Sequence, residues 1–225
     1  MRGRGPRCIA AIPITFVGMP KVLVLFSGAP EDIGAVADAI ADGAASVKFT
    51  EVEVRRIGGV ASPSLSETGN TPDSLPTVAA RRYRALESVE SIATHDALIV
   101  VNPVGEDSAG AALTQILEQA GSPDGRALMD KVGSAFSPAL SPPEVHETTI
   151  MSMLIPMMRL GMIIVPPGFS DRPAVARAMA RGSGTAAGAA SSTADVLAAA
   201  RRQGARVAKV AEWVRHAKSH EAHGH

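Results

Sequence analysis

Short apolar segments and amphipathic helical patterns alternate along this chain, and this alternation constrains its fold more than any other feature. Residues 21–26 read Lys-Val-Leu-Val-Leu-Phe, which is typical of a buried strand. Residues 31–45 then place Ile33, Val36 and Ile40 at helical spacing. Because the same succession recurs down the chain, the sequence predicts a parallel sheet that is covered by helices on both faces.

The expected elements follow from the same two periodicities. Strands are predicted at residues 21–26, 50–57, 97–101, 132–137 and 162–165. Helices are predicted at residues 31–45, 77–92, 110–120, 145–160 and 193–218, with a kink at Pro156 and with loops at 58–76 and 166–192. Charges between the apolar residues of 50–57 indicate an edge strand. This pattern predicts an α/β, flavodoxin-like three-layer αβα sandwich with a five-stranded parallel sheet in the order 2-1-3-4-5.

The composition of the chain argues against several classes of binding partner and of structure. The chain has 225 residues, enough for one α/β domain, and a formal net charge of zero, which argues against nucleic acid or an anionic membrane as a partner. The single Cys8 excludes an internal disulfide, and no apolar run approaches the ~20 residues of a membrane span. We therefore expect a cytoplasmic protein without a membrane span.

The two termini are expected to lie outside the core. Arg2, Arg4 and Arg7 precede an apolar patch at residues 8–17, which is either a targeting peptide or an upstream extension before a second start at Met19. We favour the extension. The domain organisation is then a non-core extension at 1–18, a single flavodoxin-like domain at 19–219 and a His-rich tail at 220–225.

Several segments, in order, resemble one known family. They are Lys21-Val-Leu-Val-Leu25, Asp96-Ala-Leu-Ile with Pro103, Gly161-Met-Ile-Ile-Val-Pro166, Gly168-Phe169, Arg181-Gly-Ser-Gly-Thr-Ala-Ala-Gly188 and Arg202-Gln-Gly204. Together they resemble the tryptophan-repressor-binding, flavodoxin-like NAD(P)H:quinone oxidoreductases from Pro20 onward. The resemblance implies FMN as cofactor, NAD(P)H as co-substrate, two-electron reduction of a quinone, and a homo-tetramer or homodimer.

In doubly wound folds, ligands bind beyond the carboxyl ends of the strands. The resemblance therefore implies an FMN site formed by the loops after strands one, three and four. Its residues would be Ser27, Gly28, Ala29, Asp32, Ile33, Asn102, Pro103, Val104, Gly105, Ser137 and Pro138. No catalytic side chain and no metal ligand are predicted, because a flavin carries the redox chemistry itself.

These loops depart from the family's pattern. Gly28 stands at a usual serine position, Pro30 lacks an N–H group, and Glu31 and Asp32 add negative charge where a phosphate would bind. The second loop, Asn102-Pro-Val-Gly-Glu-Asp-Ser108, lacks the family's arginine and aromatic ring, and the third loop contains three prolines. We therefore expect FMN binding to be weak or absent. The alternative function is a flavin-less structural or binding subunit that keeps the fold.

Other candidate residues have two interpretations each. Glu31 and Asp32 either complement the helix dipole or converge with Glu106 and Asp107 on a cation, with Glu144 and His146 nearby. The histidines of the C-terminal tail either share a metal or are solvated, and we favour solvation: His216, His220, His223 and His225. The methionine-rich helix at 145–160 is apolar around much of its circumference, which predicts an oligomer.

Overall fold

The computed structural model describes most of the predicted domain. It covers residues 18–27, 30–57, 83–102, 107–120, 126–138, 143–166 and 193–222. Within these ranges the side chains of 30–32, 107–112, 114, 143–147, 193 and 220–222 are not described. The predicted extension at 1–18 lies outside the described residues except for Gly18, so it stays a prediction.

The described residues form a five-stranded parallel sheet in the predicted order β2-β1-β3-β4-β5. Its strands are β1 (Lys21–Phe26), β2 (Glu51–Arg56), β3 (Ala97–Val101), β4 (Val132–Phe136) and β5 (Ile163–Ile164). The central strands β1, β3 and β4 are almost wholly buried, whereas β2 is only half-buried along its length. The predicted topology and the predicted edge position of β2 are therefore confirmed.

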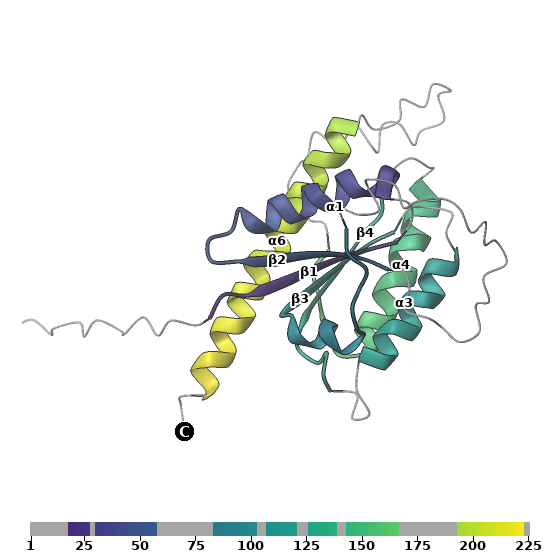
Figure 1. Cartoon of the computed structure of the whole chain (residues 1–225). Coiled ribbons are helices and arrows are strands. Elements are labelled where there is room, and N and C mark those ends of the chain that lie inside the picture. Colours follow the sequence, from purple (N-terminus) through teal and green to yellow (C-terminus); the bar gives the residue numbers. More distant parts are fainter. Residues whose placement is uncertain are drawn as a thin grey trace, which may run out of the picture.

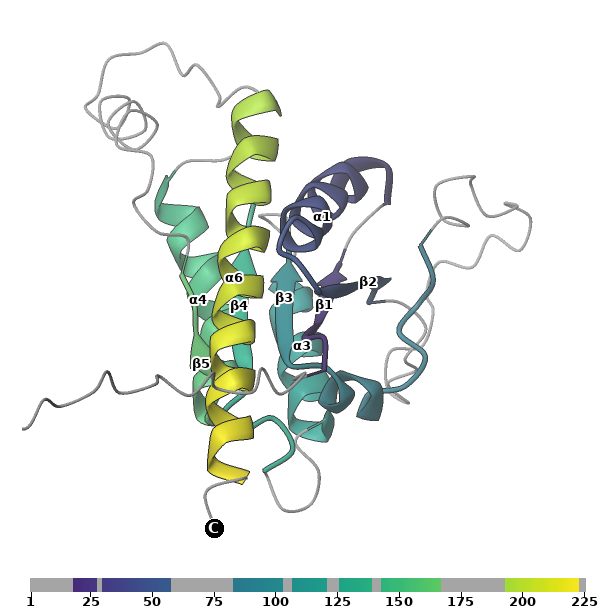
Figure 2. The same ribbon diagram turned by 90° about the vertical axis from the view of Figure 1, so that its left-hand side faces the viewer.

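Helices cover both faces of the sheet, so the molecule has three layers (Figures 1 and 2). On one face lie α1 (Pro30–Ala45) and the long α6 (Thr193–Ala222). On the other face lie α3 (Asp107–Ala120), α4 (Pro143–Arg159) and the 3-10 helix η1 (Glu90–Thr94). Alternation along β1 sends Val22, Val24 and Phe26 to the first face and Leu23 and Leu25 to the second.

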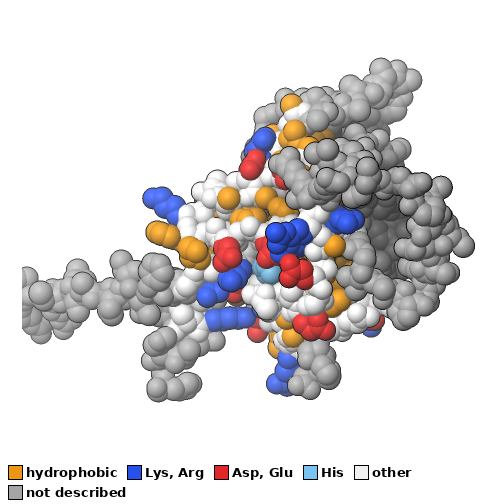
Figure 3. Space-filling model, viewed as in Figure 1, with side chains coloured by type: hydrophobic (Ala, Val, Ile, Leu, Met, Phe, Trp, Pro, Cys, Tyr) orange, Lys and Arg blue, Asp and Glu red, His pale blue; other side chains and the backbone are white. Residues whose placement is uncertain are grey.

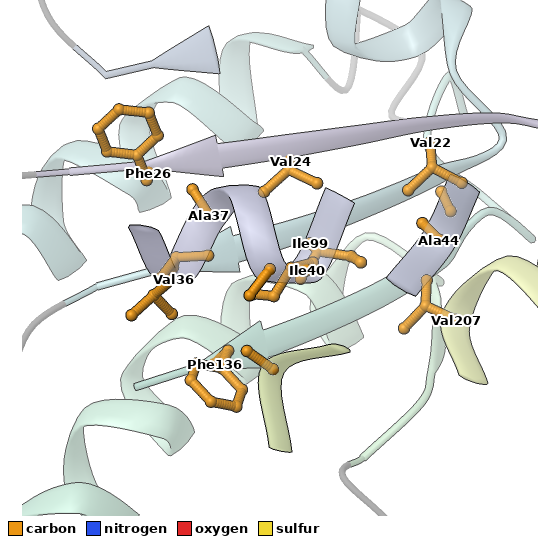
Figure 4. Close-up of a cluster of buried hydrophobic side chains, with 14 of the residues drawn as sticks. Val22, Val24, Phe26, Val36, Ala37, Ile40, Ala44, Ile99, Phe136 and Val207 are labelled. Atoms are coloured by element: carbon orange, nitrogen blue, oxygen red, sulfur yellow. The ribbon is translucent and has the colours of Figure 1, made fainter. Parts of the chain in front are cut away.

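The apolar residues predicted on one face of α1 are the ones that pack against the sheet. Val36, Ala37, Ile40 and Ala44 share one helix face and meet the side chains of β1, β3 and β4 (Figure 4). Burying a side chain of valine or isoleucine size stabilises the fold by roughly 1.5–3 kcal/mol. The helical periodicity read from the sequence therefore corresponds to the contact surface that holds α1 on the sheet.

Two glycines let α1 and α6 pack backbone to backbone. A Cβ atom on Gly43 would lie 1.9 Å from the carbonyl oxygen of Arg201, and one on Gly204 would lie 1.9 Å from that of Ile40. Neither position has room for any side chain. The helix α1, which starts at the carboxyl edge of β1, is therefore held in place by α6.

The predicted helix at 77–92 is wrong for its described part. Residues 83–89 are not helical, and only η1 forms a short 3-10 turn after them. Ala85 forms a parallel bridge with Arg56 instead, and Tyr83 donates a hydrogen bond to Asp38 (2.8 Å) and packs edge-on against Phe26. Tertiary contacts with the edge of the sheet thus outweigh the local helical preference.

Other differences concern only the ends of elements. The helix α3 begins at Asp107, three residues before the predicted start, and α6 continues to Ala222. Consequently His216 and His220 are both helical, and the predicted tail starts within a helix rather than after it. Pro156 lies inside α4. Among the described helices, none combines the length and the apolarity that a membrane span requires.

Candidate functional site

Three polar residues lie side by side where neighbouring strands end. Phe26, Val101 and Phe136 are aligned across β1, β3 and β4. The residue that follows each of them is polar and buried: Ser27, Asn102 and Ser137 are 6%, 3% and 8% exposed. Because the strands are parallel, these side chains lie at one carboxyl edge, where doubly wound folds bind ligands.

Ser27 and Asn102 are joined to one another and to the sheet. The Ser27 hydroxyl donates a hydrogen bond to Oδ1 of Asn102. The ladder also continues one residue beyond the strands, since the Ser27 N–H donates to Val101 O and the Asn102 N–H donates to Phe136 O, both at 3.1 Å. The backbone of both residues is therefore held by the sheet, and the hydrogen bond from the Ser27 hydroxyl orients the side-chain amide of Asn102.

Ser137 differs from its two neighbours. Its hydroxyl is buried and has no hydrogen-bond partner among the residues that the structure describes. Leaving a buried hydroxyl unpaired costs roughly 1–3 kcal/mol, so such groups call for an explanation. A neutral donor at this edge fits the phosphate or the ribityl chain of FMN, which carry oxygens that accept hydrogen bonds.

The helices that follow these strands open toward the same edge. The helices α1 and α3 begin at Pro30 and Asp107, within a few residues of the ends of β1 and β3, and α4 begins at Pro143 after β4. Helix N-termini carry partial positive charge and free N–H groups, which favour an anionic ligand. Pro30 and Pro143 occupy first helical positions, where the missing N–H costs little.

The remaining predicted site residues divide into two groups. Ile33 is 3% exposed and belongs to the hydrophobic core, and Pro138 is also buried beside Ser137. Outside the described residues, or without a described side chain, lie Gly28, Ala29, Glu31, Asp32, Pro103, Val104, Gly105, Glu106, Asp107, Glu144 and His146. Convergence of the four acidic residues therefore stays a prediction. Among the side chains that are described, no three His, Cys, Asp or Glu gather around a common point.

One residue of this edge was missed by the sequence reasoning. Arg56 closes β2 and is aligned with Phe26, so it belongs to the same row as Val101 and Phe136. The available signal was an arginine at the last position of an edge strand, directly before a long loop.

A second polar cluster lies elsewhere, on the outer side of β2. Figure 3 shows side chains of both charges around one histidine on this face. Glu53 contacts Arg55 and accepts from the buried His95 (Nε2 to Oε2, 3.2 Å), and Arg55 also reaches Glu87 at 3.5 Å. Partial burial raises the pKa of Glu53, but Arg55 and His95 outweigh it, so the pKa lies below its usual value. Since these groups pair with each other, the cluster stabilises the edge rather than forming a site.

The fold defines a class: a doubly wound, flavodoxin-like α/β protein with the strand order β2-β1-β3-β4-β5. Residues 20–175 match the model of the family described as NADPH-dependent FMN reductase. The match covers well over half of the chain. The protein belongs to this family.

Two relatives with the same name agree with this assignment, and one solved structure is reported beside them. A protein of Nitrobacter winogradskyi named NAD(P)H dehydrogenase (quinone) is 33% identical over 155 residues, which are 65% of this chain and 70% of that protein. A Rhodopseudomonas palustris protein of the same name is 29% identical over 158 residues, covering 68% and 75%. The crystal structure of the flavodoxin, WrbA-like protein from Agrobacterium tumefaciens is 20% identical, covers 86% of this chain and 98% of its own, and has a TM-score of 0.49.

These relatives favour the lineage of FMN-dependent NAD(P)H:quinone oxidoreductases, as the resemblance implied. The flavin-less alternative is not favoured by them. The family match supports FMN and NAD(P)H as the nucleotides of this chain.

Proposed function

We propose that this protein is an FMN-dependent NAD(P)H:quinone oxidoreductase. The observation that carries the proposal is the row of Ser27, Asn102 and Ser137 at the carboxyl edge, within a chain of the FMN reductase family. Ser137 is the decisive member of this row because its buried hydroxyl has no partner among the described residues. FMN offers acceptor oxygens for such a donor.

Each residue of the row has its own part in binding. Bound FMN supplies the chemistry of accepting a hydride and passing two electrons to a quinone. The Ser27–Asn102 hydrogen bond holds the ends of β1 and β3 at a fixed spacing, so the cofactor meets a preformed edge. The Ser137 hydroxyl donates to the cofactor from β4. The positive ends of the helix dipoles of α1, α3 and α4 attract its phosphate.

We further propose that FMN is held more weakly here than in relatives whose loops carry arginine and hydroxyl residues. The support is the composition of the loops: Glu31 and Asp32 follow β1, and Glu106 and Asp107 follow β3. Each charge pair at about 6 Å costs roughly 1–3 kcal/mol before screening. Replacing Glu31 with Thr and Asp32 with Asn should therefore tighten FMN binding, and more so at low salt.

Two measurements test the function. Purified protein is titrated with FMN while flavin fluorescence is followed, and the loaded protein is then assayed for quinone-dependent oxidation of NADPH and of NADH. Saturable binding together with two-electron turnover supports the proposal. Absence of both in the intact chain, at FMN concentrations up to the millimolar range, would return the flavin-less binding subunit as the better explanation.

We also propose that the protein acts in the cytoplasm as a homodimer or homo-tetramer. The support for assembly is a second apolar stripe on α4. Met153 and Met157 are fully buried against the sheet, whereas Met151, Ile155 and Met158 are 47%, 48% and 47% exposed at helical spacing. Single exposed apolar residues are common, but a continuous stripe on a helix indicates an interface.

A charge placed in the stripe tests the assembly. Ile155→Glu should shift the mass measured by light scattering toward the 23.1 kDa monomer, because a buried carboxylate without a partner is costly at an interface. Gln119→Glu, at an exposed position of α3, adds the same charge and should leave the mass unchanged. A monomeric unaltered chain at micromolar concentration would contradict the proposal.

A further inference from the structure

The backbone of Arg56 is held on both sides. On one side it is aligned with Phe26 of β1. On the other side its N–H donates to Arg84 O (3.1 Å) and its carbonyl accepts from the Leu86 N–H (3.0 Å). The direction of its side chain at Cβ is therefore set before any ligand arrives.

Alternation along β2 decides which face this side chain takes. Val52 and Val54 pack with the core beneath α1, so Arg56, two residues further, belongs to the α1 face. Its partner across the bridge is Ala85, which is small. Tyr83, on the same side of that segment, packs edge-on against Phe26 with ring centroids 5.1 Å apart. The guanidinium group thus leaves the sheet beside the carboxyl end of β1 and the first half of α1.

The charge of Arg56 is not compensated in the way that other half-buried arginines are. Nε of Arg56 is buried and has no hydrogen-bond partner among the described residues, and no ion pair joins its guanidinium to a carboxylate of those residues. By contrast, Arg55 pairs with Glu53 and Glu87. Nε of Arg215 is also buried without a partner among the described residues, but its Nη1 pairs with Asp96 at 2.7 Å. A buried N–H of a charged group without an acceptor is costly, and an anionic ligand would remove that cost.

We propose that Arg56 binds a phosphate monoester of the nucleotide at this edge, an inference that rests on the proposed function. The carboxyl end of β2 is one strand spacing, ~4.8 Å, from β1, whose following loop and helix form the first phosphate position. An arginine matches a phosphate dianion through paired N–H donors. It also supplies from β2 the positive charge that the loops after β1 and β3 lack.

Two phosphate monoesters could occupy this position. One is the 5′-phosphate of FMN, whose place is at the start of α1. The other is the 2′-phosphate of NADPH, because in dinucleotide folds the chain after the second strand reads the ribose 2′ position. Arg56 would set affinity for FMN over riboflavin in the first case, and preference for NADPH over NADH in the second.

The experiment compares Arg56→Met with Arg84→Met. Both changes remove one positive charge from the same bridged pair of segments, but alternation places Arg84 on the opposite face, where it is exposed. Arg56→Lys keeps the charge and loses the paired geometry. Binding of FMN, riboflavin, 2′,5′-ADP and 5′-ADP is measured by titration for each variant, at low and moderate salt.

The two sources predict different results. If the FMN phosphate is bound, Arg56→Met weakens FMN about 10- to 100-fold and leaves riboflavin unchanged. If the NADPH phosphate is bound, the same loss appears for 2′,5′-ADP but not for 5′-ADP, and the KM for NADPH rises while that for NADH does not. Arg56→Lys should recover part of either loss. Equal behaviour of Arg56→Met, Arg84→Met and the unaltered protein with all four probes would overturn the inference.

A purely structural role predicts a different pattern of stability. Since Nε of Arg56 is buried without an acceptor among the described residues, Arg56→Met should leave the melting temperature unchanged or raise it, whereas loss of a structural contact would lower it. The ADP probes contain no flavin. If Arg56→Met weakens 2′,5′-ADP in a chain that binds no FMN, the role of Arg56 is kept and the proposed function is rejected. If the chain binds FMN and Arg56→Met changes neither FMN nor 2′,5′-ADP, the proposed function is kept and the role of Arg56 is rejected.

Discussion

The two edges of the sheet differ in how their charged groups are paired. At the amino edge, Asp96 accepts from the Lys21 N–H at 2.8 Å and from Arg215 Nη1 at 2.7 Å. Lys131 Nζ donates to His95 O at 2.6 Å. At the carboxyl edge, the hydroxyl of Ser137 and Nε of Arg56 have no partner among the described residues. Nε of Arg215 and Oγ1 of Thr50 at the amino edge are also buried without a partner among these residues, but Arg215 keeps a carboxylate partner in Asp96.

We propose that pairing at the amino edge serves stability and that unpaired donors at the carboxyl edge serve binding. Charges at the amino edge pair with each other and tie the last turns of α6 to the start of the sheet. Even there burial has a cost: it lowers the pKa of Lys131 despite the nearby Asp96 carboxylate, and the charges of Lys218 and Arg215 add to the lowering. The Ser137 hydroxyl and Nε of Arg56 at the carboxyl edge lack a partner among the described residues, and we propose that a ligand supplies one.

The largest loss of stability is expected at the contact between α1 and α6, because α6 is tied to the amino edge and α1 starts at the carboxyl edge. Gly204→Ala should lower the free energy of unfolding by about 3 kcal/mol, because the new Cβ would lie 1.9 Å from Ile40 O and push α1 away from α6. FMN affinity should fall as well, since α1 starts at the carboxyl edge. Denaturant unfolding and FMN titration measure the two losses.

The control is Ala217→Gly at an exposed position of α6, which should cost only the ~1 kcal/mol difference in helix propensity. A higher melting temperature for Gly204→Ala would show that the helices are further apart than the structure has them.

A smaller effect is expected at the amino edge alone. Asp96→Asn should destabilise the protein by about 1.5–2 kcal/mol, because it leaves the half-buried Arg215 guanidinium without a carboxylate. FMN affinity should stay within a factor of about two. Asp130→Asn removes the same charge from an exposed turn and should be close to neutral. Weakened FMN binding in Asp96→Asn would show that the amino edge also affects binding, against the proposal.

Ser134 on β4 and Ser137 just after it give a matched pair, because one hydroxyl is hydrogen-bonded and the other has no partner among the described residues. Ser134 is satisfied: it donates to Val165 O at 2.7 Å and accepts from Gln203. Ser134→Ala should therefore cost about 1 kcal/mol of stability and leave FMN affinity unchanged. Ser137→Ala should leave stability unchanged or slightly raised and weaken FMN about 3- to 10-fold. Thermal melts and flavin titrations measure both properties. Equal changes of stability and of FMN affinity in Ser134→Ala and Ser137→Ala would contradict the different roles given to the two serines.

The smallest effect concerns pH and the Glu53 cluster. Because the folded pKa of Glu53 lies below the ordinary 4.5, its pairing stabilises the protein above that pH, and this contribution is lost as pH falls through the folded value. Glu53→Gln should therefore lower the melting temperature slightly near pH 7 and have less effect near pH 3. A constant difference across this range would show that the Glu53 charge does not contribute.

Part of the proposed site could be read from the sequence. The strand ends predicted Ser27, Asn102 and Ser137 as site residues, because apolar runs stop where a parallel strand leaves the sheet. Their different bonding could not be predicted, since it depends on which side chains meet across β1 and β3. Ile33 was placed at the site by resemblance, but its helical spacing with Val36 and Ile40 puts it in the core.

The layered architecture and the strand order could be predicted from the amino-acid pattern. Periodicity of two or 3.6 residues is a local property, so it identifies β1, β3, β4, α1 and α6 without any knowledge of contacts. The conformation of residues 83–94 and the bonding of Arg56 depend on contacts between distant segments. The backbone pairing of Arg56 with Ala85, and the lack of an acceptor for Nε of Arg56 among the described residues, are therefore not encoded in any local pattern.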